Sequence, residues 1–333
     1  MRLGSFRNHS GDTRIGVKMD GQMADLTAAF EKYLVQECGV GRDFAVEAAY
    51  SRMPTSMLAL LRREEEGWAD LNTVYDYLRS TLKKDAVLFS PTGAKINYGL
   101  PEVKLLTPIP EMYRVFNIGV NADIFADMEG VTPPEPGYTC MFKKTTRAIL
   151  GPEDEIKWPV TGQEVASEVE LGVIMGKTGK GISQANALDY VFGYVVSHDL
   201  VVMDVLSKAH FSGHGPAALP GAYYITLAKT PDDFQPVGPF IVTKDEVPDC
   251  QNINMEFRIN GELKIKGNTA TMRVPVRRLI EFLSADMTFL PGDLISSGGQ
   301  GTKEYMPHAF PVPGDTVEAE LENIGLLRNY IVA

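Results

Sequence analysis

Two glutamates two residues apart, Glu168 and Glu170, are the most informative feature of this sequence. They lie in a run in which positions 169, 171, 173 and 175 are all apolar, which predicts a β-strand with one buried face. The glutamates then share the other face. Two such carboxylates repel each other unless they are solvated or share a cation, and Mg²⁺, Mn²⁺ and Ca²⁺ prefer oxygen ligands. The spacing alone also fits a strand with a solvated acidic face.

Two further residues can join such a site. Asp199 ends the apolar run 193–198, where a side chain can project from the end of a strand. The alternative is an aspartate that begins the next turn. Lys229 precedes a segment rich in proline and glycine. A lysine beside a metal can hold a carboxylate or enolate oxygen, although an isolated lysine is more commonly a surface residue.

Two histidines, His210 and His214, lie in the glycine-containing stretch 209–216, which we predict to be a mobile loop. Histidine titrates near neutral pH, so either residue can act as a general acid or base on a lid. The alternative is a pair of exposed loop histidines without a role. Zinc ligation by the pair is disfavoured, because no cysteine or third histidine is close in the sequence.

The elements that position these residues fall into two predicted parts. Residues 1–108 read as a small α+β domain: short strands to residue 25, a helix capped by Asp25, and helical spacing over 57–61 and 68–82. Two prolines, Pro108 and Pro110, mark the boundary. This first part carries no obvious chemistry.

Residues 109–333 read as the catalytic, β-rich domain. Short β-prone runs separated by Gly and Pro turns recur at 115–120, 165–175, 191–197, 238–243 and 255–259. Asn260-Gly261 predicts a hairpin, and one of the few helices is predicted from a Ser183 cap through Leu188. The fold class is therefore α+β, with a β roll or sandwich. The resemblance described below adds the expectation that the site lies at the mouth of the roll.

Composition limits the partners. The 333 residues have a formal net charge of −11, which disfavours nucleic acid as a main partner. The three cysteines are scattered, which disfavours a disulfide scaffold. The first residues lack the apolar stretch of a signal peptide, and no apolar run approaches the roughly 20 residues needed to span a bilayer. We therefore expect a cytoplasmic protein without a membrane partner.

Taken in order, these pieces resemble the fumarylacetoacetate hydrolase family. The resemblance covers roughly residues 105–333, and the part before it looks like the smaller leading domain of longer members. Each matching segment is weak alone, but eight in the right order are specific. They are residues 116–121, 167–171, 187–194, 198–199, 229 with 236–239, 260–262, 290–295 and 317–325.

The resemblance turns the acidic residues into a metal site. It implies that Glu168, Glu170 and Asp199 are the ligands of Mg²⁺ or Mn²⁺, with Ca²⁺ also possible. Lys229 matches the family's active-site lysine, and Asp123 matches an extra aspartate ligand of some members. Because members are usually dimers, the resemblance also implies a homodimer.

The sequence departs from the family pattern near the site. Phe125 stands near a histidine that activates water in many members, and a phenyl ring cannot accept a proton. Residues 297–299 are Ser-Gly-Gly where Thr-Gly-Thr is usual, and Met203 stands where an arginine is usual. The metal ligands are intact, whereas the usual base and some substrate contacts are altered.

The first functional hypothesis is hydrolysis of a carbon–carbon bond in a 1,3-diketone or diketo acid through a metal-bound enolate. Lys229 would hold negative charge, and His210 or His214 would replace the missing base. The second is decarboxylation, tautomerisation or dehydration of a 2-oxo acid, which needs chiefly enolate stabilisation and is favoured by Phe125. The third is a relative that binds a ligand without catalysis. The partner in every case is a small keto compound.

Overall fold

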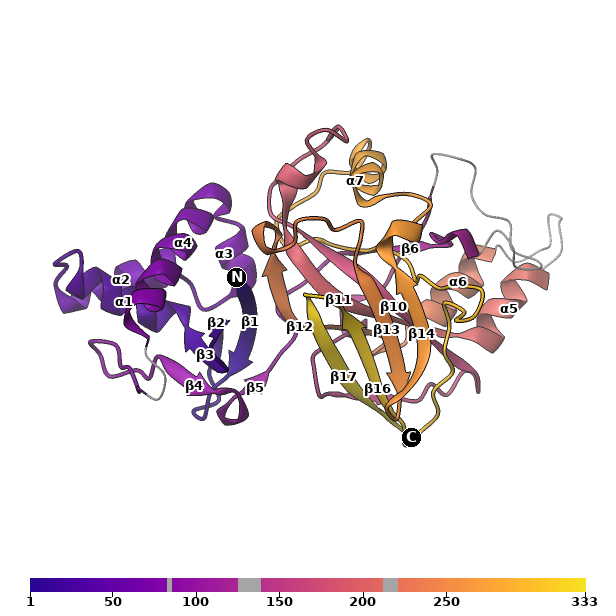
Figure 1. Cartoon of the computed structure of the whole chain (residues 1–333), viewed down its shortest axis with the longest axis horizontal. Helices are drawn as coiled ribbons and strands as arrows, with labels where there is room; N and C mark the ends of the chain where they lie inside the picture. Colours follow the sequence, from indigo (N-terminus) through magenta and orange to yellow (C-terminus); the bar gives the residue numbers. More distant parts are fainter. Residues whose placement is uncertain (83–85, 125–138, 212–220) are drawn as a thin grey trace.

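The structure is a computed structural model of the whole chain, and it describes residues 1–82, 86–124, 139–211 and 221–333, with only the backbone for 208–211 and 221–223. Figure 1 shows two lobes, an N-terminal one with helices on one side of a small group of strands and a larger β-rich one. The elements of the N-terminal lobe are β1 (Arg2–Arg7), β2 (Thr13–Met19), β3 (Gln22–Asp25), α1 (Leu26–Gln36), α2 (Arg42–Arg52), α3 (Met57–Leu61), α4 (Glu64–Thr81), β4 (Asn97–Gly99) and β5 (Lys104–Leu105).

The predicted cap of the first helix is confirmed. The Asp25 carboxylate accepts a hydrogen bond from the Ala28 amide at 2.9 Å, which satisfies one of the free N–H groups at the start of α1. Such a cap contributes about 1 kcal/mol. Of the residues whose spacing predicts an inward-facing side, Leu26, Phe30 and Leu34 are buried and Tyr33 is partly buried.

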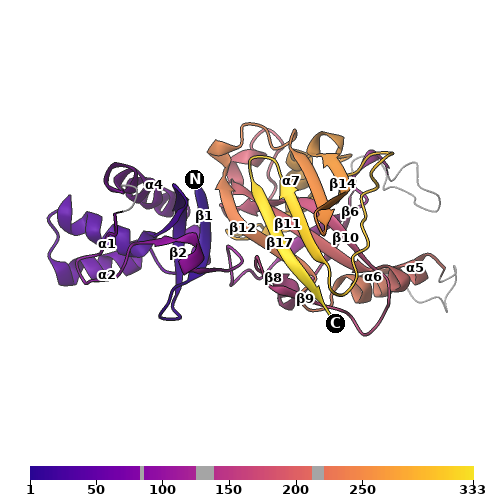
Figure 2. The same cartoon turned by 60° about the horizontal axis from the view of Figure 1, so that its bottom comes forward.

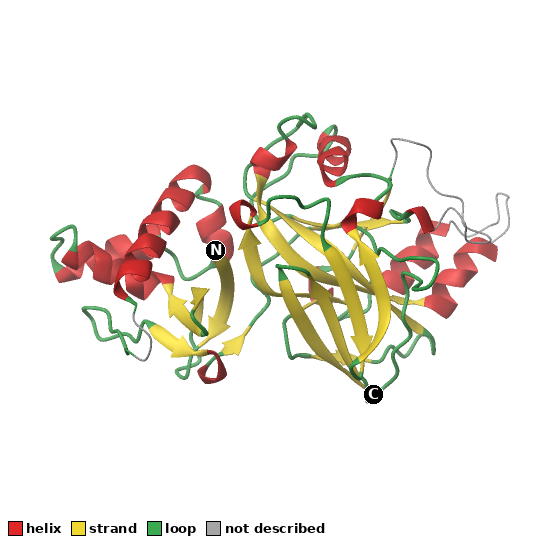
Figure 3. Ribbon diagram, viewed as in Figure 1, coloured by secondary structure: helices red, strands yellow, loops and turns green. Residues whose placement is uncertain are grey.

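The larger lobe is a β-sandwich with few helices, as Figure 3 shows by colour. Its strands are β6 (Val115–Gly119), β7 (Cys140–Lys143), β8 (Ile149–Leu150), β9 (Glu155–Lys157), β10 (Val165–Met175), β11 (Val191–Val202), β12 (Gln235–Thr243), β13 (Asn254–Ile259), β14 (Glu262–Asn268), β15 (Leu294–Ser296), β16 (Thr316–Leu321) and β17 (Gly325–Val332). Its helices include α5 (Met203–Phe211), α6 (Gly221–Lys229) and α7 (Val276–Ser284).

Two sheets form from these strands among the described residues. The larger has the order β4-β3-β2-β1-β12-β11-β10-β15-β6-β7, and the smaller has the order β14-β13-β16-β17-β9. Between the sheets, Val169, Leu171 and Val173 of β10 join a buried cluster with Phe257 and Ala319 of the smaller sheet. The fold is therefore α+β and rich in β-structure, as predicted.

The two lobes are connected through the larger sheet. Strand β1 pairs with β12, so the N-terminal strands continue the sheet that carries the acidic residues, as Figures 1 and 2 show. A second buried cluster combines Leu3 and Ile15 of the N-terminal lobe with Ile174 and Leu294 of the larger one. The division into domains 1–108 and 109–333 stays a prediction.

Local predictions in the larger lobe have mixed outcomes. The Asn260-Gly261 hairpin is confirmed: both residues have positive φ, and they connect β13 to β14. The helix predicted from Ser183 is wrong, because residues 183–186 form turns and only Ala187–Tyr190 form a short 3-10 helix. The loop predicted over 209–216 is wrong for residues 209–211, which continue helix α5; residues 212–216 lie outside the described residues.

The helices of the described residues were compared with the length and polarity that a membrane span requires. Within the described part of the chain, every helix is too short or too polar to cross a bilayer.

Candidate metal centre

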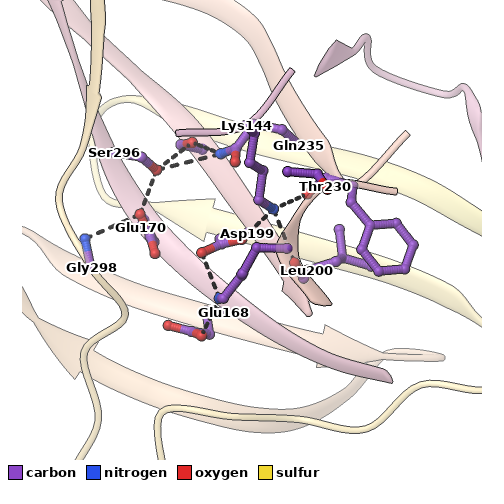
Figure 4. A network of polar contacts seen from close by, with 12 residues as sticks. Lys144, Glu168, Glu170, Asp199, Leu200, Thr230, Gln235, Ser296 and Gly298 are labelled. Atoms are coloured by element: carbon purple, nitrogen blue, oxygen red, sulfur yellow. Dashed lines mark hydrogen bonds and ion pairs between the residues drawn. The ribbon is translucent and has the colours of Figure 1, made fainter. Parts of the chain in front are cut away.

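Three carboxylates converge on one face of the larger sheet. Glu168 and Glu170 point from β10, and Asp199 lies on β11 directly opposite Glu168. One oxygen from each of the three lies within 4.8 Å of the others, and all three residues are buried. Figure 4 shows them close together over the two strands. The strand alternation that predicted a shared face thus brings Glu168 and Glu170 to Asp199.

Lys229, the last residue of α6, contacts two of these carboxylates. Its Nζ donates to Glu168 Oε1 at 3.0 Å and to Asp199 Oδ2 at 2.7 Å. The ammonium also lies 5.2 Å from the centre of the Phe142 ring, within the range of a cation–π contact. Lys229 is thus buried beside the acidic residues, and its role as an active-site lysine stays a prediction.

A second lysine, Lys144, was not singled out by any sequence motif. It is buried beside Asp199, with which it forms an ion pair. Its Nζ also donates to the carbonyls of Leu200 at 2.9 Å and Phe234 at 2.5 Å, so all its donors have acceptors. Burial lowers the pKa of Lys144 to about 8, although Asp199 opposes this shift.

The charges around Glu168 keep it ionised. Burial alone would raise its pKa, but Lys229 and His308 lower the pKa of Glu168 well below its usual range. In return, the pKa of Lys229 is raised, because Asp199 and Glu168 outweigh the cost of burying its ammonium. The buried charges of Glu168 and Lys229 therefore depend on partners of opposite sign.

Glu170 differs from the other two carboxylates. Its Oε2 accepts hydrogen bonds from Ser296 Oγ and from the Gly298 amide at 3.1 Å. Its buried Oε1 has no hydrogen-bond partner among the residues that the structure describes. Burial, followed by the charges of Asp199 and Glu168, raises the pKa of Glu170 well above its usual range. No ion pair joins this carboxylate to a lysine or arginine of the part of the chain that the structure describes.

The residues present fit a divalent cation. The three carboxylates outnumber the two ammonium groups of Lys144 and Lys229, and the free oxygen of Glu170 faces its like-charged neighbours. Carboxylate oxygens are the ligands that Mg²⁺, Mn²⁺ and Ca²⁺ prefer, and a bound cation would supply the missing charge.

His308 is a further residue that sequence reasoning missed. Its Nε2 lies 3.3 Å from Glu168 Oε1. The neighbouring Ala309 exchanges two backbone hydrogen bonds with Ser167, which fixes the segment against the edge of the acidic site. Because His308 is far from Glu168 in the sequence, no local motif could have identified it.

His198 is next to Asp199 in sequence but faces the other way. Its ring packs against Phe257 in the sandwich core, with 5.1 Å between ring centres. Burial lowers the pKa of His198 to about 3, so it is a neutral core residue. It does not face the carboxylates, because neighbouring strand residues point to opposite sides.

The other predicted site residues lie elsewhere or outside the described residues. Asp123 is exposed and is not part of the cluster of three carboxylates. His210 belongs to helix α5, but its side chain is not described. His214 and Phe125 lie outside the described residues. The metal-ligand role of Asp123 and the base role of either histidine stay predictions.

Contacts around Gly299 explain why residues 297–299 are Ser-Gly-Gly rather than the Thr-Gly-Thr of the family pattern. A Cβ atom on Gly299 would lie 2.7 Å from Glu168 Oε2 and 3.1 Å from its Cβ. Any side chain at position 299 would therefore displace the Glu168 carboxylate from its present position. The missing threonine leaves the space that this carboxylate uses.

The fold and the site define a β-sandwich protein with a buried carboxylate centre suited to a divalent metal. The chain belongs to the fumarylacetoacetate hydrolase family: the family model for the fumarylacetoacetate (FAA) hydrolase C-terminal domain matches residues 114–332. A mitochondrial oxaloacetate tautomerase of Homo sapiens is 36% identical over 235 residues, which cover 69% of this chain and 70% of that protein.

Solved structures agree with this assignment. Maleylpyruvate hydrolase from Sphingobium sp. SYK-6, in complex with manganese(II) ion and pyruvate, has a TM-score of 0.68 and 26% identity, with coverage of 100% of this chain and 99% of that one. A fumarylacetoacetate hydrolase from Exiguobacterium antarcticum has a TM-score of 0.70 and 25% identity at the same coverage. The chain is thus a member of a family of enzymes, one of which is described with a divalent metal.

Proposed function

We propose that this protein is a divalent-metal-dependent enzyme that binds a 2-oxo acid and stabilises its enolate. The observation that carries the proposal is the convergence of Glu168, Glu170 and Asp199 within 4.8 Å in a buried site, with Lys229 bonded to two of them. The manganese described in the Sphingobium relative supports Mn²⁺ or Mg²⁺ as the cation.

The residues have distinct roles in this proposal. Glu168, Glu170 and Asp199 would hold the cation, which when bound polarises a carbonyl as a Lewis acid. The ammonium of Lys229 holds the negative charge that develops on the substrate oxygen as the enolate forms. Its attraction is strong because the site is buried, where charges are less screened than in water.

The reaction that we favour is keto–enol tautomerisation. It requires a proton to move between a carbon and an oxygen of the substrate, with no attacking water. His308 contacts Glu168, one of the three carboxylates, and we assign the proton transfer to this histidine. The identity of 36% to an oxaloacetate tautomerase supports this reaction and a dicarboxylic 2-oxo acid as the substrate class.

Hydrolysis of a carbon–carbon bond in a 1,3-diketone or diketo acid is the second candidate. The same enolate would be the leaving group, and a histidine, either His308 or the predicted His210 or His214, would activate water. Its specific support is the full-length similarity to a maleylpyruvate hydrolase. Here too Lys229 would hold negative charge.

One experiment tests the function and separates the two reactions. The purified protein is incubated with enol-oxaloacetate and with acylpyruvates, with Mn²⁺ or Mg²⁺ and with excess chelator, in ¹⁸O-labelled water. Tautomerisation changes the enol absorbance and leaves carbon–carbon bonds intact. Hydrolysis yields two products, one of them a carboxylic acid that carries the label.

Each result has a defined meaning. Activity that disappears with chelator and returns with metal is the expected outcome. Turnover that is unaffected by complete removal of metal would refute the proposal. Metal binding without turnover of either substrate class would favour the non-catalytic alternative instead.

Two predictions from the sequence stand beside this function. We propose a homodimer from the family resemblance, which sedimentation velocity can test. A cytoplasmic location also stays a prediction, and imaging of the full-length protein in its own cell can test it.

A further inference from the structure

A chain of buried polar side chains lies behind Glu170, outside the three carboxylates themselves. It starts at Gln235 on β12, continues through Ser197 on β11 and ends at Ser296 on β15. All three residues are fully buried. Figure 4 shows Gln235 and Ser296 on the far side of Glu170 from Glu168.

The contacts follow one another without a gap. Gln235 Nε2 donates to Ser197 Oγ at 2.7 Å, and the Oγ atoms of Ser197 and Ser296 are 2.8 Å apart. Ser296 Oγ in turn donates to Glu170 Oε2. A weaker contact of 3.4 Å joins Gln235 Nε2 directly to Ser296 Oγ.

The chemistry of these groups gives the chain a direction. An amide nitrogen only donates, so the Ser197 oxygen accepts from Gln235 and its hydroxyl hydrogen is free for Ser296. A carboxylate oxygen only accepts, so the hydroxyl hydrogen of Ser296 is used on Glu170. The donors therefore run from Gln235 to the carboxylate, and each polarises the next.

This arrangement fixes which oxygen of Glu170 is free. Oε2 already accepts from Ser296 Oγ and from the Gly298 amide, whereas Oε1 has no partner among the described residues. Rotation of the carboxylate would break both bonds to Oε2. The chain therefore holds Glu170 with one oxygen presented to Glu168 and Asp199.

The position of the chain argues against a purely structural role. Ser296 pairs with Gly172, which is two residues from Glu170 on the same face of β10, and the next pair on this face, Ile174 and Leu294, is part of an apolar cluster. Apolar side chains at the same positions would avoid the cost of burying polar groups. Three polar residues that end on one carboxylate are expected where that carboxylate must be oriented.

We propose that Gln235 is a positioning residue for the metal centre, and that it acts through Ser197 and Ser296 to orient Glu170 toward the cation. The inference rests on the proposed function, because it assumes that Glu170 binds metal. Groups that orient metal ligands in this way commonly change metal affinity by about 10- to 100-fold when they are removed.

Calorimetric titration of Mn²⁺ into the metal-free full-length protein tests the inference. Gln235→Met, Ser197→Ala and Ser296→Ala are each expected to raise the Kd for Mn²⁺ by about 10-fold or more. Ser296→Thr keeps the hydroxyl and is expected to bind more tightly than Ser296→Ala. The double variant Gln235→Met/Ser296→Ala is expected to bind no more weakly than Ser296→Ala alone, because both changes interrupt one chain.

A matched control is a buried amide in the other sheet. Asn329 is buried and donates to the carbonyls of Gly151 at 2.8 Å and Asp154 at 3.0 Å. Asn329→Leu should lower the thermal stability of the metal-free protein without changing its Kd for Mn²⁺. A merely structural role of Gln235 would give the same result for Gln235→Met.

The outcomes are distinguishable from those of the functional proposal. If the wild type binds no divalent metal, the proposed function fails. If the wild type binds Mn²⁺ and Gln235→Met and Ser197→Ala bind it equally well, the function stands and this inference is overturned. If Gln235→Met does not fold, Ser197→Ala decides the question, since it removes the link by the loss of a single oxygen.

Discussion

Glu168 and Asp199 are directly paired across β10 and β11, and Lys229 donates a hydrogen bond to each of them. Like charges at directly opposed positions of a sheet destabilise it. The pair is tolerated because Lys229 lies between them and Lys144 contacts Asp199 from another side. Glu170, on the same face, forms no ion pair with a lysine among the described residues, and this imbalance underlies the predictions for the site.

Glu170→Gln tests whether the Glu170 carboxylate requires the positive charge of a bound cation. The pKa of Glu170 is raised well above its usual range, so the metal-free protein gains stability when this group is protonated and loses it as pH rises through that pKa. We therefore expect the metal-free variant to unfold at a higher temperature than the metal-free wild type at pH 8. Mn²⁺ should raise the melting temperature of the wild type only, since stabilisation requires binding. Scanning calorimetry with and without Mn²⁺ measures both effects.

Glu318→Gln is the control for this variant, because Glu318 pairs with Arg328 in the smaller sheet. It should keep the full shift with Mn²⁺. An equal shift in Glu170→Gln would contradict the assignment of Glu170 as a ligand.

Lys229→Met tests whether the ammonium of Lys229 stabilises the negative charge that develops on the substrate oxygen. Loss of one donor to a developing oxyanion commonly costs about 100- to 1,000-fold in rate, so we expect a fall of kcat in this range. The Kd for Mn²⁺ should not rise, because an ammonium repels a metal ion. Steady-state kinetics with calorimetric titration separate the two effects. Lys244→Met is the control, because Lys244 donates to backbone carbonyls of Leu188 and Asp189 instead; unchanged kcat in Lys229→Met would remove the proposed role.

His308→Asn tests the proton transfer. Asparagine keeps a polar side chain but cannot carry a proton, and removal of a general acid or base commonly lowers the rate about 100- to 10,000-fold. We expect kcat to fall in this range while the Kd for Mn²⁺ changes little. If kcat is unchanged, the base is another group, and His210 and His214 become the next residues to replace.

Asp25→Asn tests a pH dependence far from the site. Burial raises the pKa of Asp25 from 3.8 to about 6, so the folded state favours its protonated form. The associated stability is present below pH 4 and is lost as pH rises through about 6. A shift of about two units corresponds to about 3 kcal/mol.

Asparagine can keep the cap on Ala28 and does not ionise. The stability of Asp25→Asn relative to the wild type should therefore increase from pH 4 to pH 7, as urea unfolding at both pH values can measure. A constant difference between the two proteins would show that the carboxyl does not titrate in this window.

Asn117→Leu tests a buried amide next to Ser296 in the sheet. Neither side-chain polar atom of Asn117 has a partner among the described residues, although the residue is fully buried. Leucine has a similar volume, so we expect the free energy of unfolding to stay the same or rise by about 1–2 kcal/mol. Urea unfolding measures this change.

The control for Asn117 is Asn121, whose amide bonds to Val274 and Ser297. Asn121→Leu should lower the free energy of unfolding by about 3 kcal/mol. A comparable loss in Asn117→Leu would indicate that its amide holds a buried water molecule.

The sequence predicted the parts of the site that depend on strand geometry. Alternation along β10 placed Glu168 and Glu170 on one face. Asp199 was expected at the end of a strand, but it lies within β11, which continues to Val202, and it reaches the site because it pairs with Glu168. Lys144 and His308 could not be found in this way, because they reach the carboxylates only after β10 pairs with distant segments. Their contacts depend on tertiary pairing, which local periodicity does not encode.

The same distinction applies to the fold. The cap of α1 was predictable because Asp25 and Ala28 are three residues apart and interact locally. The helix expected after Ser183 did not form: the chain makes a turn in which the Asn186 amide donates to the Ser183 carbonyl, and only Ala187–Tyr190 form a 3-10 helix. The pairing of β1 with β12 was not predicted, since it joins the beginning of the chain to residues beyond 240.

The three converging carboxylates, Glu168, Glu170 and Asp199, come from two adjacent strands of the larger sheet, β10 and β11. The spacing of these side chains is therefore set by backbone hydrogen bonding within the sheet. Insertions or substitutions in connections that carry no predicted ligand or base can accumulate without moving these three carboxylates. Such an arrangement lets one scaffold diversify its substrates over evolution, and it recommends these connections for directed libraries that retain metal binding.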